Sequence, residues 1–332
     1  MSVLKFGGAL AVAATCVQVA WAQGTMFKEP ALEALYQAEQ HEELLRTATP
    51  RLAARPDDAQ AVLALAMAAL ARNNAATRQQ ALDAAASCVE KQPQAAACHY
   101  AQGVVLGVQA MSEGLMKAAR SAGTVRQALI TAQTNEPAWY PARSALVEFY
   151  LLAPGMMGGS TSQAAELARS APTPEQVRTL EARIAMNDRR FEDGLKLLAG
   201  LPAALPPALA EDVRGWGVQC ALGMANAGQA AAALPAVEKL VREHPEHAGP
   251  VFALARVRAE AGQHEAAVVL YEQAAKLRGA HELPVAWRLG ISQQQLGRTE
   301  AARASFQRFV AAGKGHKTSL EDARKRLAQL GT

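Results

Sequence analysis

The C-terminal half of the chain repeats one pattern of small and apolar positions among polar ones, at intervals of 34 or 35 residues. A small residue opens each copy, a glycine follows seven residues later, and an alanine comes five residues after the glycine. Two further apolar positions follow at helical spacing, so the pattern predicts three helix pairs in a row. The copies are Ala221, Gly228, Ala233, Val237 and Leu240; Ala255, Gly262, Ala267, Tyr271 and Ala274; and Gly290, Gly297, Ala302, Phe306 and Phe309.

Each position of this pattern has a physical role in a pair of crossing helices. The small residue at Ala255 and its equivalents lets the second helix cross close to the first. The glycine, as at Gly262, ends the first helix, because the left-handed backbone conformation costs little only for glycine or asparagine. The bulkier residue, such as Tyr271, fills the gap between successive pairs. Each copy is therefore expected to form two antiparallel helices joined at the glycine.

These residues resemble the tetratricopeptide-repeat family, whose repeat has the same period. The resemblance is plainest in Ala-Gly-Gln-His-Glu-Ala-Ala (261–267) and Leu-Gly-Arg-Thr-Glu-Ala-Ala (296–302), and it covers residues 208–312. The aromatic signature of the first helix is only partly kept, since Trp287 stands one residue from its usual place. The resemblance implies an all-α, right-handed superhelical solenoid that binds partners and catalyses no reaction.

The N-terminal half carries weaker copies of the same pattern, several of them closed by a proline. Proline stops a helix without needing a donor of its own. The predicted segments are a second helix around Leu44, Leu45, Thr49 and Leu52, closed by Pro56; 59–72 with 76–91, closed by Pro93; 95–111 with 125–133, closed by Pro137 and containing an insertion at 112–123; 138–152 with 163–170; and 175–198.

The whole array amounts to about eight antiparallel helix pairs, and a polar helix at 319–330 caps the last apolar face. Composition supports an all-α chain, because alanine is abundant, aromatics make up 5% and runs of alternating β-branched residues are absent. We expect degenerate pairs over 23–200, a stiff proline-rich linker at 201–207, and well-formed repeats with the capping helix over 208–332.

The first 22 residues are predicted to form a cleavable signal peptide. Lys5 precedes an apolar stretch at 9–20, and Ala20-Trp21-Ala22 places the cut before Gln23. A membrane anchor would need about 20 consecutive apolar residues. A lipoprotein site at Cys16 is disfavoured, because Thr15 before it is too large. We therefore expect a mature protein in the periplasm or secreted, with no transmembrane segment.

Export changes the interpretation of the cysteines. Cys88 ends one predicted helix and Cys98 begins the next, so a disulfide between them is the preferred interpretation in an oxidising compartment. The alternative is two buried thiols. Cys220 is expected to be a buried free thiol.

Net charge and motifs exclude several classes of function. The formal net charge of +4 is spread over helix surfaces, and the densest basic run is Arg324-Lys325-Arg326, so we expect no nucleic-acid partner. A proline turn separates the members of a small cluster, His244, Glu246 and His247, so we expect a solvated loop there and not a metal site. No catalytic motif is found, so we expect neither enzyme activity nor a cofactor.

A glycine-rich segment at 153–160 offers an alternative, small-ligand function. It runs into a predicted helix, so its N–H groups are candidates for holding an anion. The competing interpretation is an elongated turn in which Met156 and Met157 pack as gap fillers. The candidate anion-binding residues are Gly155, Gly158, Gly159 and Ser160.

The leading hypothesis is an exported scaffold or adaptor that binds a protein or peptide through its concave groove, in the assembly of an envelope complex. In proteins of this family the first helices line the groove. Phe252 and Trp287 have an alternative role, which is packing between neighbouring first helices. An enzyme whose site is assembled from distant residues is the further alternative. The candidate partner-binding residues are Tyr100, Asn226, Phe252, Arg256, Glu260, Trp287, Ile291 and Gln294.

Overall fold

The computed structural model describes residues 24–202, 204–313 and 315–331, so the predicted signal peptide lies outside the described residues. In the described part the chain is all-α, as predicted. Seventeen α-helices and two short 3-10 helices follow one another, and the only β-pairing among these residues is an isolated bridge between His247 and Arg278.

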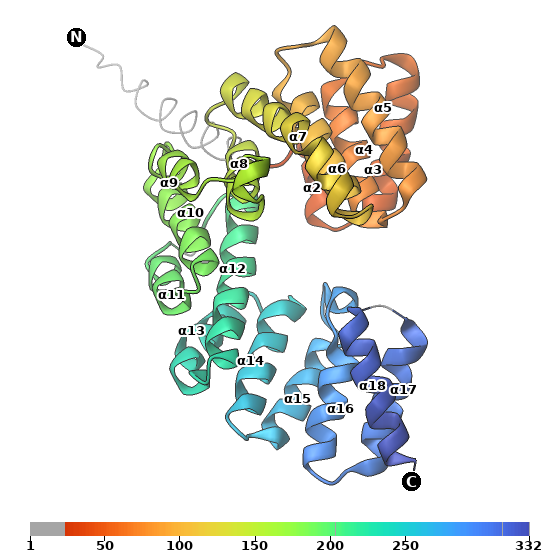
Figure 1. Ribbon diagram of the computed structural model, residues 1–332, viewed down its shortest axis with the longest axis vertical. Helices are drawn as coiled ribbons and strands as arrows, with labels where there is room; N and C mark the ends of the chain where they lie inside the picture. Colours follow the sequence, from red (N-terminus) through yellow and green to blue (C-terminus); the bar gives the residue numbers. More distant parts are fainter. Residues whose placement is uncertain (1–23, 203, 314, 332) are drawn as a thin grey trace, which may run out of the picture. The chain divides into compact units, whose positions relative to one another are not determined.

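The α-helices succeed one another as eight helix–turn–helix pairs and one final helix, which agrees with the predicted repeat (Figure 1). The first four pairs are α2 (Pro30–Gln37) and α3 (His41–Ala54), α4 (Ala59–Arg72) and α5 (Ala75–Lys91), α6 (Ala96–Ser112) and α7 (Leu115–Asn135), and α8 (Tyr140–Leu152) and α9 (Thr161–Arg169). The others are α10 (Pro174–Asn187) and α11 (Phe191–Ala199), α12 (Pro207–Asn226) and α13 (Ala230–Glu243), α14 (Ala248–Glu260) and α15 (His264–Ala274), and α16 (Val285–Gln295) and α17 (Thr299–Ala312), followed by α18 (Lys317–Leu330). The 3-10 helices are η1 (Gly155–Met157) and η2 (Ala280–Glu282).

The chain divides into two compact units. Unit 1 comprises Met1–Ile184 and Ala204–Glu211, and unit 2 comprises Ala185–Ala203 and Asp212–Thr332. The boundaries fall inside α10, between residues 203 and 204, and inside α12, so one of the three lies within the predicted linker at 201–207. Leu201 and Leu205 are both buried, whereas Pro202 and Ala204 are exposed.

The repeat register places its small residues at close helix crossings in unit 2. Ala255 and Ala267 are fully buried. A Cβ added at Gly290 would lie 2.7 Å from Cε1 of Phe306, so only glycine fits there without a shift of the ring. Gly262 adopts a φ of +77° just after α14, as predicted for a glycine that ends a first helix.

The bulkier positions of the register fill the core of unit 2. Val237 and Phe306 are fully buried, and Tyr271 is 1% exposed. Burying one such side chain is worth roughly 1.5–3 kcal/mol, so each of these positions stabilises the packing between successive helices.

An N-terminal strap, residues 24–28, ties together distant parts of unit 1. The indole N–H of Trp139 donates to the carbonyl of Thr25 at 2.9 Å. The amide of Ala208 donates to the carbonyl of Gly24 at 2.9 Å, and Phe27 is buried. The strap therefore holds the start of α12 and the N-terminal end of α8 to the same segment.

The insertion predicted at 112–123 is for the most part a helix, and this part of the prediction was wrong. α7 runs without interruption from Leu115 to Asn135. Ala122 and Val125 are buried, whereas Gly123 is exposed. An exposed glycine costs a helix only about 1 kcal/mol, and packing of the opposite face offsets this cost.

The packing of Ala267 leads to a test of the register. Ala267→Leu should overpack the crossing of α14 and α15 and lower the free energy of unfolding by about 1–3 kcal/mol, measured by chemical denaturation. Ala266→Leu is the control, because Ala266 is exposed on the same helix. Equal stability of the two variants would show that Ala267 does not lie at the crossing.

Candidate partner-binding site

Polar side chains on the first helices of unit 2 form hydrogen bonds from one helix to the next. The guanidinium of Arg256 on α14 donates to Oδ1 of Asn226 on α12 at 2.8 Å. It also donates to Oε1 of Glu260, one turn along α14, at 3.0 Å. Arg256 is 7% exposed, while Asn226 and Glu260 are exposed. This network holds an arginine in place beneath two accessible polar groups.

A second network joins α16 to the capping helix α18. The indole N–H of Trp287 donates to Oδ2 of Asp322 at 2.7 Å, and Nε of Arg326 donates to the same oxygen at 2.8 Å. Arg326 also donates to Oε1 of Gln294 at 2.8 Å. The ring of Trp287 stacks on Phe309, with 6.2 Å between centroids. Trp287 is thus fixed by both its ring and its N–H.

Arg288 is the basic residue between these two networks, and the sequence analysis did not single it out. Its guanidinium carbon lies 4.1 Å above the centre of the Trp287 ring. Nε of Arg288 is buried without a hydrogen-bond partner, and no ion pair to Arg288 occurs among the residues the structure describes. Burial, together with the positive charge of Arg256, lowers the pKa of Arg288 to about 10.

The charged members of the two networks, together with Asn226 and Arg288, are called the polar belt. Three of its members come from α12 and α14, one from α16 and two from α18. All of them lie in unit 2. The residues of the polar belt are Asn226, Arg256, Glu260, Arg288, Asp322 and Arg326.

The predicted aromatic contact residues do not lie open to solvent. Phe252 is 4% exposed, and its ring packs 5.7 Å from that of Tyr271 on the second helix α15. Tyr100 is buried 4.9 Å from Trp139 in unit 1. Ile291 is half-buried against the cluster around Phe306 and Phe309. Periodicity placed these residues on the first helices but did not show which neighbours cover them.

Amide groups of the glycine-rich loop donate hydrogen bonds to nearby carbonyls of the same chain. The N–H groups of Gly158, Gly159 and Ser160 donate to the carbonyls of Gly155, Pro154 and Tyr150, respectively. The Ser160 hydroxyl caps α9 by accepting from the amide of Gln163 at 3.3 Å. A Cβ at Gly159 would collide with the Ala153 carbonyl, at 1.7 Å. The glycines therefore serve a tight turn, and Met156 is 93% exposed instead of packed.

The His244–His247 segment is partly buried, contrary to the solvated loop expected from sequence. His247 is 6% exposed because residues 246–248 pair with Arg278 of the following loop. The Arg278 guanidinium lies 2.7 Å from Nε2 of His247. Arginine has only donors, so this nitrogen accepts and the imidazole is neutral. Burial, then Arg214 and Arg278, lowers the pKa of His247 to about 4, although Glu246 opposes the shift.

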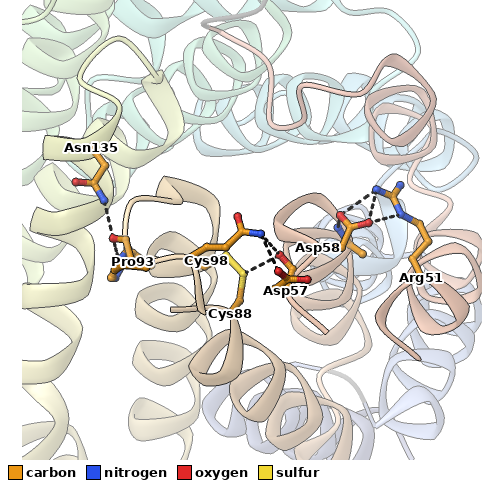
Figure 2. The surroundings of a disulfide bond; sticks show 10 residues. Arg51, Asp57, Asp58, Cys88, Pro93, Cys98 and Asn135 are labelled. Carbon is orange, nitrogen blue, oxygen red and sulfur yellow. Dashed lines mark hydrogen bonds and ion pairs between the residues drawn. A yellow bond between two sulfur atoms is a disulfide. The ribbon is translucent and has the colours of Figure 1, made fainter. Parts of the chain in front are cut away.

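The structure joins Cys88 and Cys98 in a disulfide, with 5.8 Å between the Cα atoms (Figure 2). Both residues are fully buried. Gln92, between them, donates to the carbonyl of Asp57 at 2.9 Å, and Asn135 donates to the carbonyl of Pro93 at 3.2 Å. The disulfide thus closes the α5–α6 turn, and the two hydrogen bonds hold this turn against α7 and the α3–α4 turn. Cys220 is a buried free cysteine.

Unit 1 has a surface depression lined mostly by polar residues. A depression of about 560 Å³ in unit 1 is bounded by the start of α3 and the end of α4, and Glu42 there pairs with Arg72 at 3.1 Å. Within the described residues, no group of three or more His, Cys, Asp or Glu side chains is placed to hold a metal ion. None of the described helices has the length and apolarity needed to span a bilayer.

Solved structures with a similar fold include human IFIT1. The IFIT1 dimer with m7Gppp-AAAA matches with a TM-score of 0.55 and 14% identity, over 82% of this chain and 62% of that one. The IFIT1 dimer with PPP-AAAA matches with a TM-score of 0.54 and 14% identity, over 82% and 63%. The chain thus spans less than two thirds of IFIT1, and at this identity the likeness concerns the fold alone.

A tetratricopeptide repeat protein from Parabacteroides merdae ATCC 43184 also matches, over 79% of this chain and 96% of that one, with 10% identity and a TM-score of 0.46. No protein-family model and no curated protein matches the chain in sequence. The buried register in unit 2 and the paired helices decide the fold. It is an all-α repeat of antiparallel helix pairs, as the tetratricopeptide resemblance predicted.

The disulfide leads to a prediction about stability. Replacing both cysteines (Cys88→Ala/Cys98→Ala) should lower the free energy of unfolding by about 2–3 kcal/mol, because the ten-residue loop that they close becomes free in the unfolded chain. Dithiothreitol should destabilise the wild-type protein and leave the double variant unchanged. An equal effect of the reductant on both proteins would contradict the assignment.

His247 leads to a prediction about pH. A histidine whose pKa falls on folding binds fewer protons in the native state, so stability is lost as the pH falls from the unfolded pKa of 6.5 towards 4. The free energy of unfolding should drop by up to about 3 kcal/mol more in the wild-type protein than in His247→Gln over this range. Denaturation curves measured at several pH values test this, and parallel pH profiles of the two proteins would refute it.

Proposed function

We propose that this protein is an exported scaffold that binds a protein or peptide partner through the first helices of unit 2. The polar belt is the observation on which the proposal depends. It presents hydrogen-bonding groups from α12, α14, α16 and α18, and partly covered arginines are typical of interface residues. Repeats of this type bind partners along a surface built from successive units.

Binding, and not catalysis, is the function that suits this chemistry. The carboxylates of Glu260 and Asp322 are engaged by Arg256 and Arg326, with N–O distances of 3.0 and 2.8 Å. Groups held in this way orient a partner by hydrogen bonds and charge, and they leave no general base positioned near a nucleophile.

The proposal includes export and a place in the cell envelope. It is supported by the sequence of residues 1–22 and by the buried Cys88–Cys98 disulfide, since disulfides persist mainly in oxidising compartments. A role in assembling an envelope complex follows from combining this location with a partner-binding face.

RNA is not the partner that we propose. The IFIT1 structures contain capped or triphosphorylated RNA, but the resemblance to them is one of fold. The polar belt alternates positive and negative groups, and a nucleic-acid site needs a continuous basic surface.

Site-specific photo-cross-linking in cells tests the partner-binding face. A photoreactive amino acid at Asn226 should yield a discrete adduct with one protein, whereas the same probe at Gln273 on α15 should not. Both positions are exposed, so the comparison separates binding at this face from cross-linking that any exposed position would give. Identical adducts at both positions, no adduct at all, or adducts with RNA would contradict the proposal.

Cell fractionation tests export. The mature protein should be recovered from the periplasm or the medium with an N-terminus at Gln23. Ala22→Leu should block cleavage, because the residue before the cut must be small, and a precursor should accumulate. A cytoplasmic protein that keeps its first 22 residues in both forms would rule out the export claim.

A further inference from the structure

The turn between α6 and α7 in unit 1 carries a cluster of exposed apolar side chains. Of the seven large hydrophobic side chains that are exposed in the described part of the chain, four lie here, at the end of α6 and the start of α7. Leu115 and Met116 are 75% and 71% exposed. Single exposed apolar side chains need no explanation, but a group of them marks an interaction surface. This group is called the apolar tip, and its residues are Val108, Met111, Leu115 and Met116.

The apolar tip projects from the packed part of unit 1. Every residue at 111–117 is exposed, and Ala122 is the first buried residue of α7. Further back the two helices pack closely, since a Cβ added at Gly103 would lie 2.9 Å from Leu129. At the turn itself, a Cβ added at Gly114 would meet no atom within 4 Å. The tip is thus the convex end of a helix hairpin, and no other described segment covers its apolar side chains.

Positive charge accompanies the apolar tip. The hairpin at 96–135 has three basic residues and one acidic residue, so it carries a net charge of +2. Glu113 pairs with Lys117 at 3.5 Å, and Arg120 and Arg126 provide the excess charge. With about 100° between successive residues of a helix, these two arginines lie on the same half of α7 as the two apolar residues of its first turn. All four side chains are exposed.

We propose that the apolar tip inserts into the surface of a bilayer that contains anionic phospholipids. The inference goes beyond the proposed function, because it concerns unit 1 and not the polar belt of unit 2. Apolar side chains enter the boundary between headgroups and acyl chains to a depth of about 5–10 Å, and basic side chains near them bind the anionic headgroups. Arg120 follows Leu115 by about 7.5 Å along the axis of α7, so it can reach headgroups while Leu115 lies among the acyl chains.

The shape and charge of the tip favour a bilayer over a macromolecular partner. A bilayer is fluid and needs no groove of matching shape, and the flexible side chains of Met111 and Met116 adapt easily to such a surface. A second copy of the chain, docked through the same tip, would place two hairpins of net charge +2 against each other. A nucleic acid would meet the arginines but leave the apolar side chains in water.

Co-sedimentation with lipid vesicles tests the proposal on the mature full-length protein. Vesicles of phosphatidylcholine with about 30% phosphatidylglycerol should bind more protein than vesicles of phosphatidylcholine alone, and added salt should weaken the binding. Leu115→Ser/Met116→Ser should bind about tenfold to a hundredfold more weakly, because two apolar side chains no longer leave water. Val269→Ser should bind like the wild type, and it is the matched control because Val269 is an exposed apolar residue of unit 2.

The basic residues are tested by a second pair of variants. Arg120→Gln/Arg126→Gln should weaken binding to the anionic vesicles about tenfold or more, because each cation near the surface contributes to the attraction. Arg324→Gln/Lys325→Gln removes the same number of charges from exposed positions of α18 and should have little effect. Equal losses in the two double variants would reveal an effect of net charge alone and overturn the site. All these side chains are exposed, so unchanged melting temperatures should show that the variants are folded.

Fluorescence distinguishes insertion from adsorption by charge. Tryptophan introduced by Leu115→Trp should add emission that shifts to shorter wavelength with anionic vesicles and is quenched by brominated lipid. The same substitution in unit 2, Val269→Trp, should give no such change. Emission from position 115 that is insensitive to the vesicles would overturn insertion.

The remaining outcomes are also decisive. Absence of vesicle binding, or binding that Leu115→Ser/Met116→Ser leaves unchanged, would overturn the proposal. A dimer that is seen by analytical ultracentrifugation and is lost in this variant would assign the tip to a second copy and overturn the proposal as well. None of these results decides the proposed function, because cross-linking at Asn226 reports on unit 2.

Discussion

Close helix crossings at small residues are the constraint on which unit 2 depends. Where Ala267 or Gly290 lies, the partner helix approaches so closely that a larger side chain has no room. The approach in turn places Tyr271 and Phe306 in the gaps between successive helices, where both are buried. Because the same kind of crossing recurs in each helix pair, it sets the distance between successive first helices. It therefore also sets the distances between the members of the polar belt.

The same packing explains why the face of unit 2 is polar and not aromatic. Phe252 and Trp287 lie on first helices, but each is covered by a neighbour: Tyr271 in one case, and Phe309 with α18 in the other. The side chains that remain accessible between them are amides, carboxylates and guanidinium groups. In the proposed function, such a face would recognise a partner by the placement of its hydrogen bonds and charges more than by apolar area.

Unit 1 obtains its order by other means, because its repeats are more degenerate. The Cys88–Cys98 disulfide fixes one inter-helix turn, and the strap at 24–28 bonds to Trp139 and Ala208, which are far away in sequence. In unit 2 a comparable tie is the bridge between the loops at His247 and Arg278. These links stabilise loops that the helix register alone leaves open.

The sequence by itself determined the helix pairs, the register of unit 2 and the ends of its first helices. These features depend on local spacing and on the φ that glycine permits, and Gly262 and Ala267 lie where that spacing put them. It did not determine the helical continuity of α7, because Gly123 is tolerated on an exposed face. Which side chains stay accessible, and that Arg288 forms no ion pair with a described residue, was decided only by the tertiary structure. The reason is physical: burial and the hydrogen bonds between helices depend on neighbours 30 or more residues away, such as Asn226 beside Arg256 and Asp322 beside Trp287.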